Sequence, residues 1–150
     1  MVAELKPEEL TNLGEKAVNI ATRKGAEEAE AFLSISSSVF VGIERGQIVR
    51  SVKGMDRGLG VRVLYKKAVG FSYTNILTNK TIQDAAVKAF HSAKASKPDK
   101  NWISLPSPKK PSATKNTYDK RLTAIPPDEL VETASVALDA AEGYDKRVFP

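Results

Sequence analysis

Residues 59–73 read LGVRVLYKKAVGFSY, and on either side of Lys66-Lys67 an apolar residue recurs at every second position. Residues 29–43, AEAFLSISSSVFVGI, show the same alternation over a longer distance. A period of two places successive side chains on opposite faces of a β-strand, so both stretches predict strands with one apolar face. We therefore expect the chain to be organised around an antiparallel sheet.

The predicted sheet is a meander of four strands. Glycine supplies the positive φ that tight reversals need, and short connections permit only antiparallel neighbours. Arg45-Gly46, Asp56-Arg57-Gly58 and Lys66-Lys67 are the predicted turns. The four strands are residues 29–43, 48–52, 59–65 and 69–73.

Three helices are predicted around the sheet. Pro7 opens the first, Thr78 caps the second, and Pro126-Pro127 begins the third, which Gly143 ends. The expected fold class is α+β, an antiparallel four-stranded sheet with helices packed on one face and the order α-β-β-β-β-α-loop-α. Residues 1–143 form one domain, with a long basic loop at 96–126, and residues 144–150 are interpreted as the start of a truncated following segment.

The net charge of +5 is concentrated in one segment. Residues 94–121 contain eight basic and two acidic residues, which leaves 15 basic and 16 acidic residues elsewhere. Because that segment has the prolines and lysines of a solvated connector, we do not expect binding to nucleic acid. The absence of cysteine from the sequence favours a cytoplasmic protein, and no apolar run has the length of a membrane-spanning helix.

The sequence contains too few metal ligands for zinc hydrolysis. A catalytic zinc needs about three protein ligands, usually including two histidines. His91 is the only histidine, and it lies beside the apolar stripe of the second helix. We expect no catalytic residue, no metal ligand and no cofactor in this chain. Gly58-Leu59-Gly60 lacks the third glycine of a dinucleotide-binding loop, and a strand follows it where a helix is required.

Five polar residues near predicted strand ends are the candidate contacts to a partner or peptide. They are Asp56, Arg57, Tyr73, Thr74 and Asn75. Rigid elements present side chains at such positions to binding partners. The same residue types also suit tight turns, through side-chain hydrogen bonds to the backbone, so both interpretations stay open.

Several motifs in order resemble the N-terminal domain of the TldD/PmbA family, whose members have also been called modulators of DNA gyrase. The most specific is DRGLGVRV at residues 56–63. The others are KGAEEAE at 24–30, ERGQI at 44–48, GFSYTN at 70–75, YDKRL at 118–122 and DEL at 128–130. The resemblance implies a cytosolic peptidase system in which a zinc-bearing subunit and a related zinc-less subunit assemble and cleave peptides.

This chain departs from the family pattern in one respect. The metal-binding H-E-x-x-x-H motif of the family belongs to a C-terminal part that is absent here, so zinc is expected only in that part of a zinc-bearing member. The expected partners are a related TldD/PmbA-family subunit and a peptide substrate, with no membrane. A free-standing binding or assembly protein of the same fold and without a peptidase role is the alternative.

The predicted strand at residues 29–43 suggests a physical role for such a domain. A long edge strand can pair with an extended peptide or another subunit through main-chain hydrogen bonds. The hypothesis requires that this strand lie at an edge of the sheet rather than in its middle.

Overall fold

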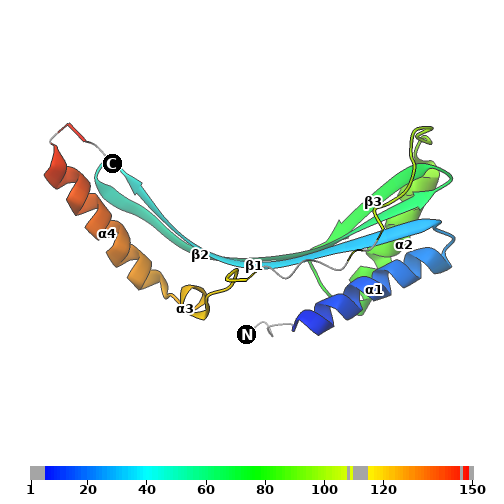
Figure 1. The fold of residues 1–150 in the computed structure, drawn as a ribbon, viewed down its shortest axis with the longest axis horizontal. Coiled ribbons are helices and arrows are strands. Elements are labelled where there is room, and N and C mark those ends of the chain that lie inside the picture. The colour runs from blue at the N-terminus through cyan, green and yellow to red at the C-terminus, as the bar shows by residue number, and fades with distance from the viewer. Residues whose placement is uncertain (1–5, 108, 110–114, 146, 149–150) are drawn as a thin grey trace. The chain divides into compact units, whose positions relative to one another are not determined.

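A computed structural model describes residues 6–107, 109, 115–145 and 147–148 (Figure 1). The elements, in chain order, are α1 (Pro7–Arg23), β1 (Glu28–Glu44), β2 (Gln47–Tyr65), β3 (Ala68–Thr74), α2 (Asn79–Ala95), α3 (Lys120–Thr123) and α4 (Pro127–Tyr144). The chain divides into two compact units, unit 1 with Met1–Ser36 and Asp56–Pro108, and unit 2 with Ser37–Met55 and Lys109–Pro150.

The α+β class is confirmed, but the prediction of four strands is wrong. The described residues form a three-stranded sheet in the order β1-β2-β3, and the predicted second and third strands are parts of one 19-residue strand, β2. Asp56-Arg57-Gly58 lies inside it and makes no turn, and the only glycines with positive φ among the described residues are Gly25 and Gly46. The 17-residue β1 pairs alongside β2, so the chain can stay extended through Gly58 where the sequence suggested a reversal.

The other two predicted turns, Arg45-Gly46 and Lys66-Lys67, are confirmed. Arg45 and Gly46 have φ of 53° and 74°, and Lys66 and Lys67 have φ of 49° and 62°. Positive φ at both central positions is the signature of a type I′ hairpin turn, whose twist matches that of the strands it joins. After the second turn β2 and β3 pair antiparallel, from Tyr65 opposite Ala68 to Leu59 opposite Thr74.

The core of unit 1 lies between the sheet and two helices. Figure 1 shows α1 and α2 on the same side of the strands. Ala17 and Ala21 of α1 are fully buried, as are Leu59, Val61 and Val63 of β2. In α2 the predicted apolar stripe is confirmed, because Ile82, Ala85, Ala86, Ala89, Phe90 and Ala93 are all buried. Thr78 caps this helix by accepting a hydrogen bond from the amide of Thr81.

β3 alternates as predicted, but its large side chains do not face the helices. Phe71 and Tyr73 are 58% and 76% exposed, whereas Ala68 and Gly70 are buried. Gly70 pairs with Val63, which belongs to the core, and cross-strand partners share a face. The backbone of α2 lies so close to Gly70 that no side chain fits between them. The aromatic residues of β3 therefore lie on the helix-free face of the sheet.

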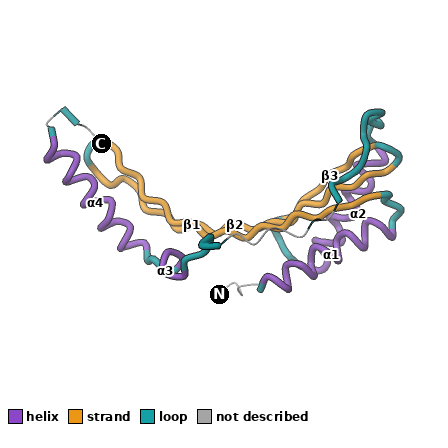
Figure 2. Tube along the Cα trace, viewed as in Figure 1, coloured by secondary structure: helices purple, strands orange, loops and turns teal. Residues whose placement is uncertain are grey.

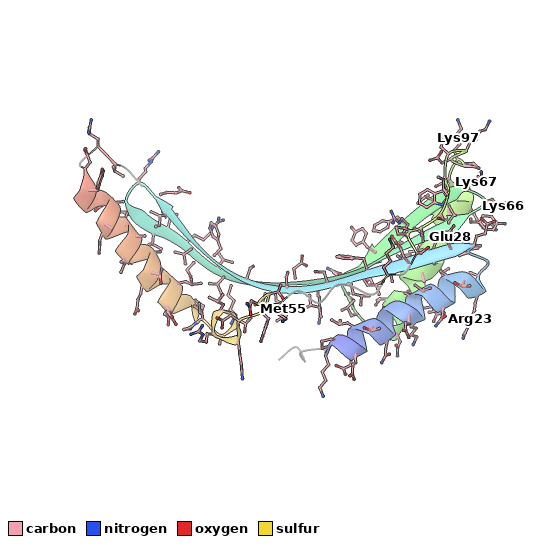
Figure 3. All side chains as sticks on the ribbon, viewed as in Figure 1. Arg23, Glu28, Met55, Lys66, Lys67 and Lys97 are labelled. Atoms are coloured by element: carbon pink, nitrogen blue, oxygen red, sulfur yellow. The ribbon has the colours of Figure 1, made fainter. Side chains whose placement is uncertain are left out.

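The loop that follows α2 is attached to the β2–β3 turn. The amide of Asp99 donates to the carbonyl of Lys67 (2.8 Å), and the ammonium of Lys67 donates to the carbonyl of Lys100 (3.4 Å). Figure 3 shows Lys66, Lys67 and Lys97 at this end of unit 1, near Glu28. The Glu28 carboxylate accepts a hydrogen bond from the amide of Leu105. Residues 96–107 of the predicted long loop are thus held against unit 1.

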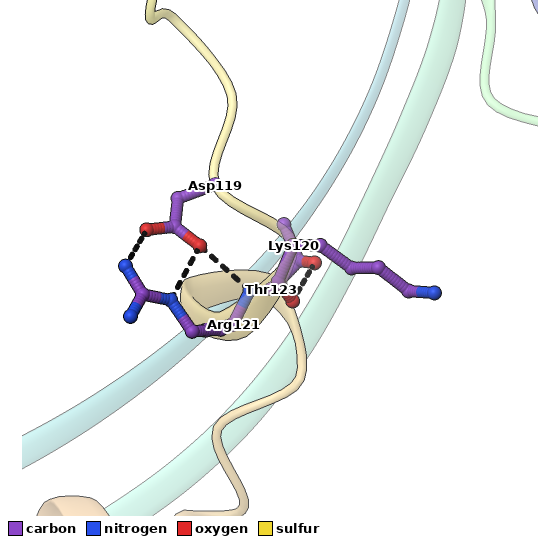
Figure 4. Close-up of polar contacts among 4 residues, drawn as sticks. All are labelled: Asp119, Lys120, Arg121 and Thr123. Carbon is purple, nitrogen blue, oxygen red and sulfur yellow. Dashed lines mark hydrogen bonds and ion pairs between the residues drawn. The ribbon is translucent and has the colours of Figure 1, made fainter.

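Unit 2 combines the outer parts of β1 and β2 with α3 and α4, coloured by secondary structure in Figure 2. α3 is a one-turn helix within the predicted loop, and Asp119 caps it by accepting from the amide of Arg121 at 2.8 Å (Figure 4). α4 continues one residue beyond Gly143, where the sequence predicted its end. Its Glu142 approaches Gly46 in the β1–β2 turn. No described residue of unit 2 is buried.

Two further sequence predictions concern the membrane and the last residues. Among the described helices, none has both the length and the apolar character needed to span a bilayer. The predicted segment 144–150 is described only at residues 144, 145, 147 and 148, and Val148 donates from its amide to the carbonyl of Asp145. Its remaining residues lie outside the described part, so the predicted domain boundary stays a prediction.

Candidate functional site

An open groove of about 470 Å³ lies on the helix-free face of unit 1, where β3 ends and β2 continues. It contains all five residues that the sequence singled out. Its lining residues are Phe32, Ser34, Asp56, Arg57, Gly58, Leu59, Gly60, Phe71, Tyr73, Thr74 and Asn75. We call this the β2–β3 groove.

Asp56 and Arg57 lie in β2, before the first β2–β3 pair. The groove is lined there by five consecutive residues of one strand, 56–60. Because successive side chains of a strand point to opposite faces, such lining shows that the groove reaches the strand's edge. The turn interpretation of Asp56 and Arg57 is wrong, since both residues are in extended backbone.

Thr74 follows the predicted turn interpretation more closely, and Asn75 lies in the bend that comes after it. Thr74 is the last residue of β3, and its hydroxyl accepts from the amide of Ile76 and donates to the same residue's carbonyl, both at 3.1 Å. Thr81 also donates to the carbonyl of Ile76. These contacts shape the connection to α2. Tyr73 stands next to them with most of its side chain exposed.

The sequence did not single out Phe32, Phe71, Gly58 and Gly60 as site residues. Phe71 and Tyr73 are stacked, with ring centroids 6.4 Å apart, and Phe32 on β1 is 74% exposed. Gly60 lies opposite Tyr73, and a Cβ there would come within 3.1 Å of the Phe71 ring. The Phe71 ring therefore packs close to the backbone of Gly60, where there is no side chain to displace it. The alternation in residues 69–73 places Phe71 and Tyr73 on one face of the strand. It would have identified them as site residues if that face had been known to be the exposed one.

The groove is suited to binding rather than to chemistry. Beside it, Arg62 forms an ion pair with Glu30, and Asp56 and Arg57 bring one charge of each sign into the lining itself. His91 lies exposed on α2, outside the groove. Within the described ranges, no three His, Cys, Asp or Glu residues are grouped so that they could hold a metal. Exposed aromatic rings beside mixed polar groups are typical of surfaces that bind proteins or peptides.

Residues 29–93 match the model of a protein family described as PmbA/TldA metallopeptidase domain 1. The chain contains the first domain of the PmbA/TldD family. The matched range covers β1 from Ala29, the whole of β2 and β3, and α2 as far as Ala93, and it includes the five predicted residues. The DRGLGVRV motif of this PmbA/TldD domain is the part of β2 that carries the groove and then enters the core.

Solved structures resemble this PmbA/TldD domain over most of the chain. TldE from Thermococcus kodakarensis has a TM-score of 0.77 and 25% identity, covering 88% of this chain and 29% of its own. A proposed modulator of DNA gyrase from Bacteroides thetaiotaomicron has a TM-score of 0.79, 22% identity and coverages of 96% and 33%. A similarly described protein from Thermotoga maritima has a TM-score of 0.61 and 18% identity, and the match covers 91% of this chain and 30% of that protein.

The PmbA/TldD domain described here spans about a third of the length of these solved proteins. The two likenesses below 25% identity establish the fold alone. No curated protein matched the sequence.

Proposed function

We propose that this chain is the non-catalytic N-terminal domain of a TldD/PmbA-type zinc metallopeptidase system that acts in peptide proteolysis or maturation. It contributes by binding a related TldD/PmbA-family subunit or a peptide in the cytoplasm. The observation that carries the proposal is the β2–β3 groove, in which the most family-specific motif and the exposed Tyr73 meet.

The donor set of this chain does not fit a catalytic zinc. The sequence has one histidine and no cysteine, and the described residues contain no suitable cluster of three ligands. A zinc-bearing member of the system would hold the metal in its C-terminal part. The role left to this chain is therefore recognition, for which exposed aromatic residues are effective because they bury a large area at low cost in conformational entropy.

Association with a full-length TldD/PmbA-family subunit from the same organism tests the proposal, measured by biolayer interferometry. We expect Tyr73→Ala to weaken binding about tenfold or more, as truncation of an aromatic anchor does. Ile103→Ala is the matched control, because Ile103 is 93% exposed and does not line the groove. No association of the unaltered chain, or equal binding by both variants, would contradict the assembly role.

A second measurement addresses the non-catalytic assignment. We expect the purified 150-residue chain to contain no stoichiometric zinc and to leave peptides uncleaved. Bound zinc in equimolar amount together with peptide cleavage by the chain alone would refute it.

A further inference from the structure

A second open groove, of about 770 Å³, runs between α1 and β1 in unit 1. α1 lines it with residues spaced four apart, including Leu10, Gly14 and Val18, which share one face of the helix. β1 lines it with Ala31, Phe32 and Leu33. We call this the α1–β1 groove.

The three β1 residues that line the groove are consecutive. A cavity on one face of a strand touches alternate residues only, so this groove lies along the strand's edge. β1 has β2 on one side and no strand on the other among the described residues. No backbone hydrogen bond between described segments reaches Ala31, Phe32 or Leu33 from outside the sheet. Main-chain donors and acceptors of β1 are therefore available along the groove.

α1 supplies the second wall of the groove. A Cβ at Gly14 would lie 2.9 Å from Cδ1 of Leu33, so the missing side chain lets the strand come close to the helix. On either side of Gly14, Leu10 and Val18 remain only half-buried. The groove thus joins an unpaired strand edge to a row of apolar helix side chains, a combination that accepts an extended chain and its alternate side chains.

The charge of the groove indicates what kind of chain fits. Glu15 is the only titratable residue that lines it, and it is exposed. α1 has the acids Glu8, Glu9 and Glu15 against Lys16 and Arg23, and residues 28–36 add two acids and no base. The two walls together carry a charge of −3, or −2 once Arg62, which pairs with Glu30, is counted, although the whole chain carries +5. A basic ligand is favoured, whereas edge pairing of two copies would bring two acidic walls together.

We propose that the α1–β1 groove binds an extended, basic peptide as an additional strand on β1, with alternate apolar side chains against Leu10 and Val18 and a lysine or arginine near Glu15. This goes beyond the function proposed above, because it assigns a second binding site that shares only Phe32 with the β2–β3 groove and needs no partner subunit. Main-chain pairing supplies affinity with little demand on sequence, while the groove selects for charge and for apolar residues at every second position.

The probe is a fluorescein-labelled peptide, Lys-Thr-Val-Thr-Val-Thr-Lys, in which the lysines and valines share one face of the strand, titrated with the chain and followed by fluorescence anisotropy. Two N-methylated versions distinguish strand addition from simple apolar contact, since each removes the amide hydrogens at one set of alternate positions. In an added strand only one set faces β1. We expect one version to bind at least about tenfold more weakly and the other to bind nearly unchanged. Equal affinities of the two versions would overturn the proposal.

The charge preference is tested with Glu15→Gln, and Glu132→Gln on α4 is the matched control. Removing an exposed ion pair should weaken binding of the peptide roughly two- to fivefold at low salt, and the control should leave it unchanged. Replacing both lysines of the peptide with glutamate should weaken binding more than Glu15→Gln does, because an attraction becomes a repulsion. The assignment would be refuted if neither change altered the affinity for the peptide. It would also be refuted if the chain self-associated through this edge and the peptide did not compete.

Failure of this site is distinguishable from failure of the proposed function. The peptide is titrated against the isolated chain, whereas assembly is measured with a second subunit. Tyr73→Ala should weaken assembly without changing peptide binding, because Tyr73 does not line the α1–β1 groove. A loss of peptide binding in that variant would contradict two separate sites.

Discussion

Gly70 of β3 lies directly against the α2 backbone at Ala93. A Cβ at position 70 would be 2.1 Å from the amide nitrogen of Ala93 and 2.2 Å from the carbonyl oxygen of Ala89. These are main-chain atoms, so they cannot rotate away as a side chain would. The spacing between the sheet and α2 is therefore fixed by the absence of a side chain at one residue.

Gly70→Ala should destabilise the chain by about 3 kcal/mol or more, because the helix must move away from the strand. Gly143→Ala is the control, since nothing lies within 4 Å of a Cβ there. Gly143 lies inside α4, so alanine should stabilise it by about 0.5–1 kcal/mol. Urea denaturation measures both changes. An unaltered midpoint for Gly70→Ala would contradict the close packing.

The Lys66-Lys67 turn carries backbone strain, because both lysines have positive φ. Replacing the pair with Asn-Gly, which suits a type I′ turn, should stabilise the chain by about 1 kcal/mol. The amide of residue 66 would still donate to the Glu27 carboxylate. Replacement with Ala-Ala removes the same two charges and keeps both Cβ atoms, so it should not stabilise. If both variants were stabilised equally, the cause would be the loss of the two charges and not the relief of backbone strain.

Stability should differ between the two units. All fully buried apolar residues among those described belong to unit 1, and a two-stranded hairpin has little stability of its own. Amides in the β2 segment 59–64 should exchange with deuterium more slowly than those at 49–53, by on the order of a hundredfold. Both segments belong to one strand, which makes the comparison direct. Uniform protection along β2 would show that unit 2 is stabilised as strongly as unit 1.

The pKa of Asp119 is lowered from its ordinary value of 3.8, first by the side-chain hydrogen bonds from Arg121 and then by the Arg121 amide. A depressed folded-state pKa contributes stability above the unfolded value, and this contribution is lost as pH falls below 3.8 through the folded pKa. The NMR titration midpoint of the Asp119 carboxyl should lie below 3.8 and rise in Arg121→Gln. A midpoint that stays constant in that variant would exclude the arginine as the cause.

Local patterns in the sequence were sufficient to predict much of unit 1. Thr78 caps α2 because its hydroxyl can accept from an amide three residues away, a relationship that depends on no other part of the chain. The alternation at 59–65 marks a half-buried strand wherever that strand is placed. The shortage of imidazole and thiol ligands is likewise a property of composition.

What the sequence alone could not determine depends on contacts between distant residues. Asp56-Arg57-Gly58 has the composition of a turn, but pairing along β1 gives its backbone partners in an extended form, so β2 continues through it. The exposed face of β3 was decided in the same way, because only the position of α2 excludes a side chain at Gly70 and turns Phe71 and Tyr73 outward. Both grooves follow from these placements, since a groove is formed by residues from separate elements, and local periodicity does not specify which elements meet.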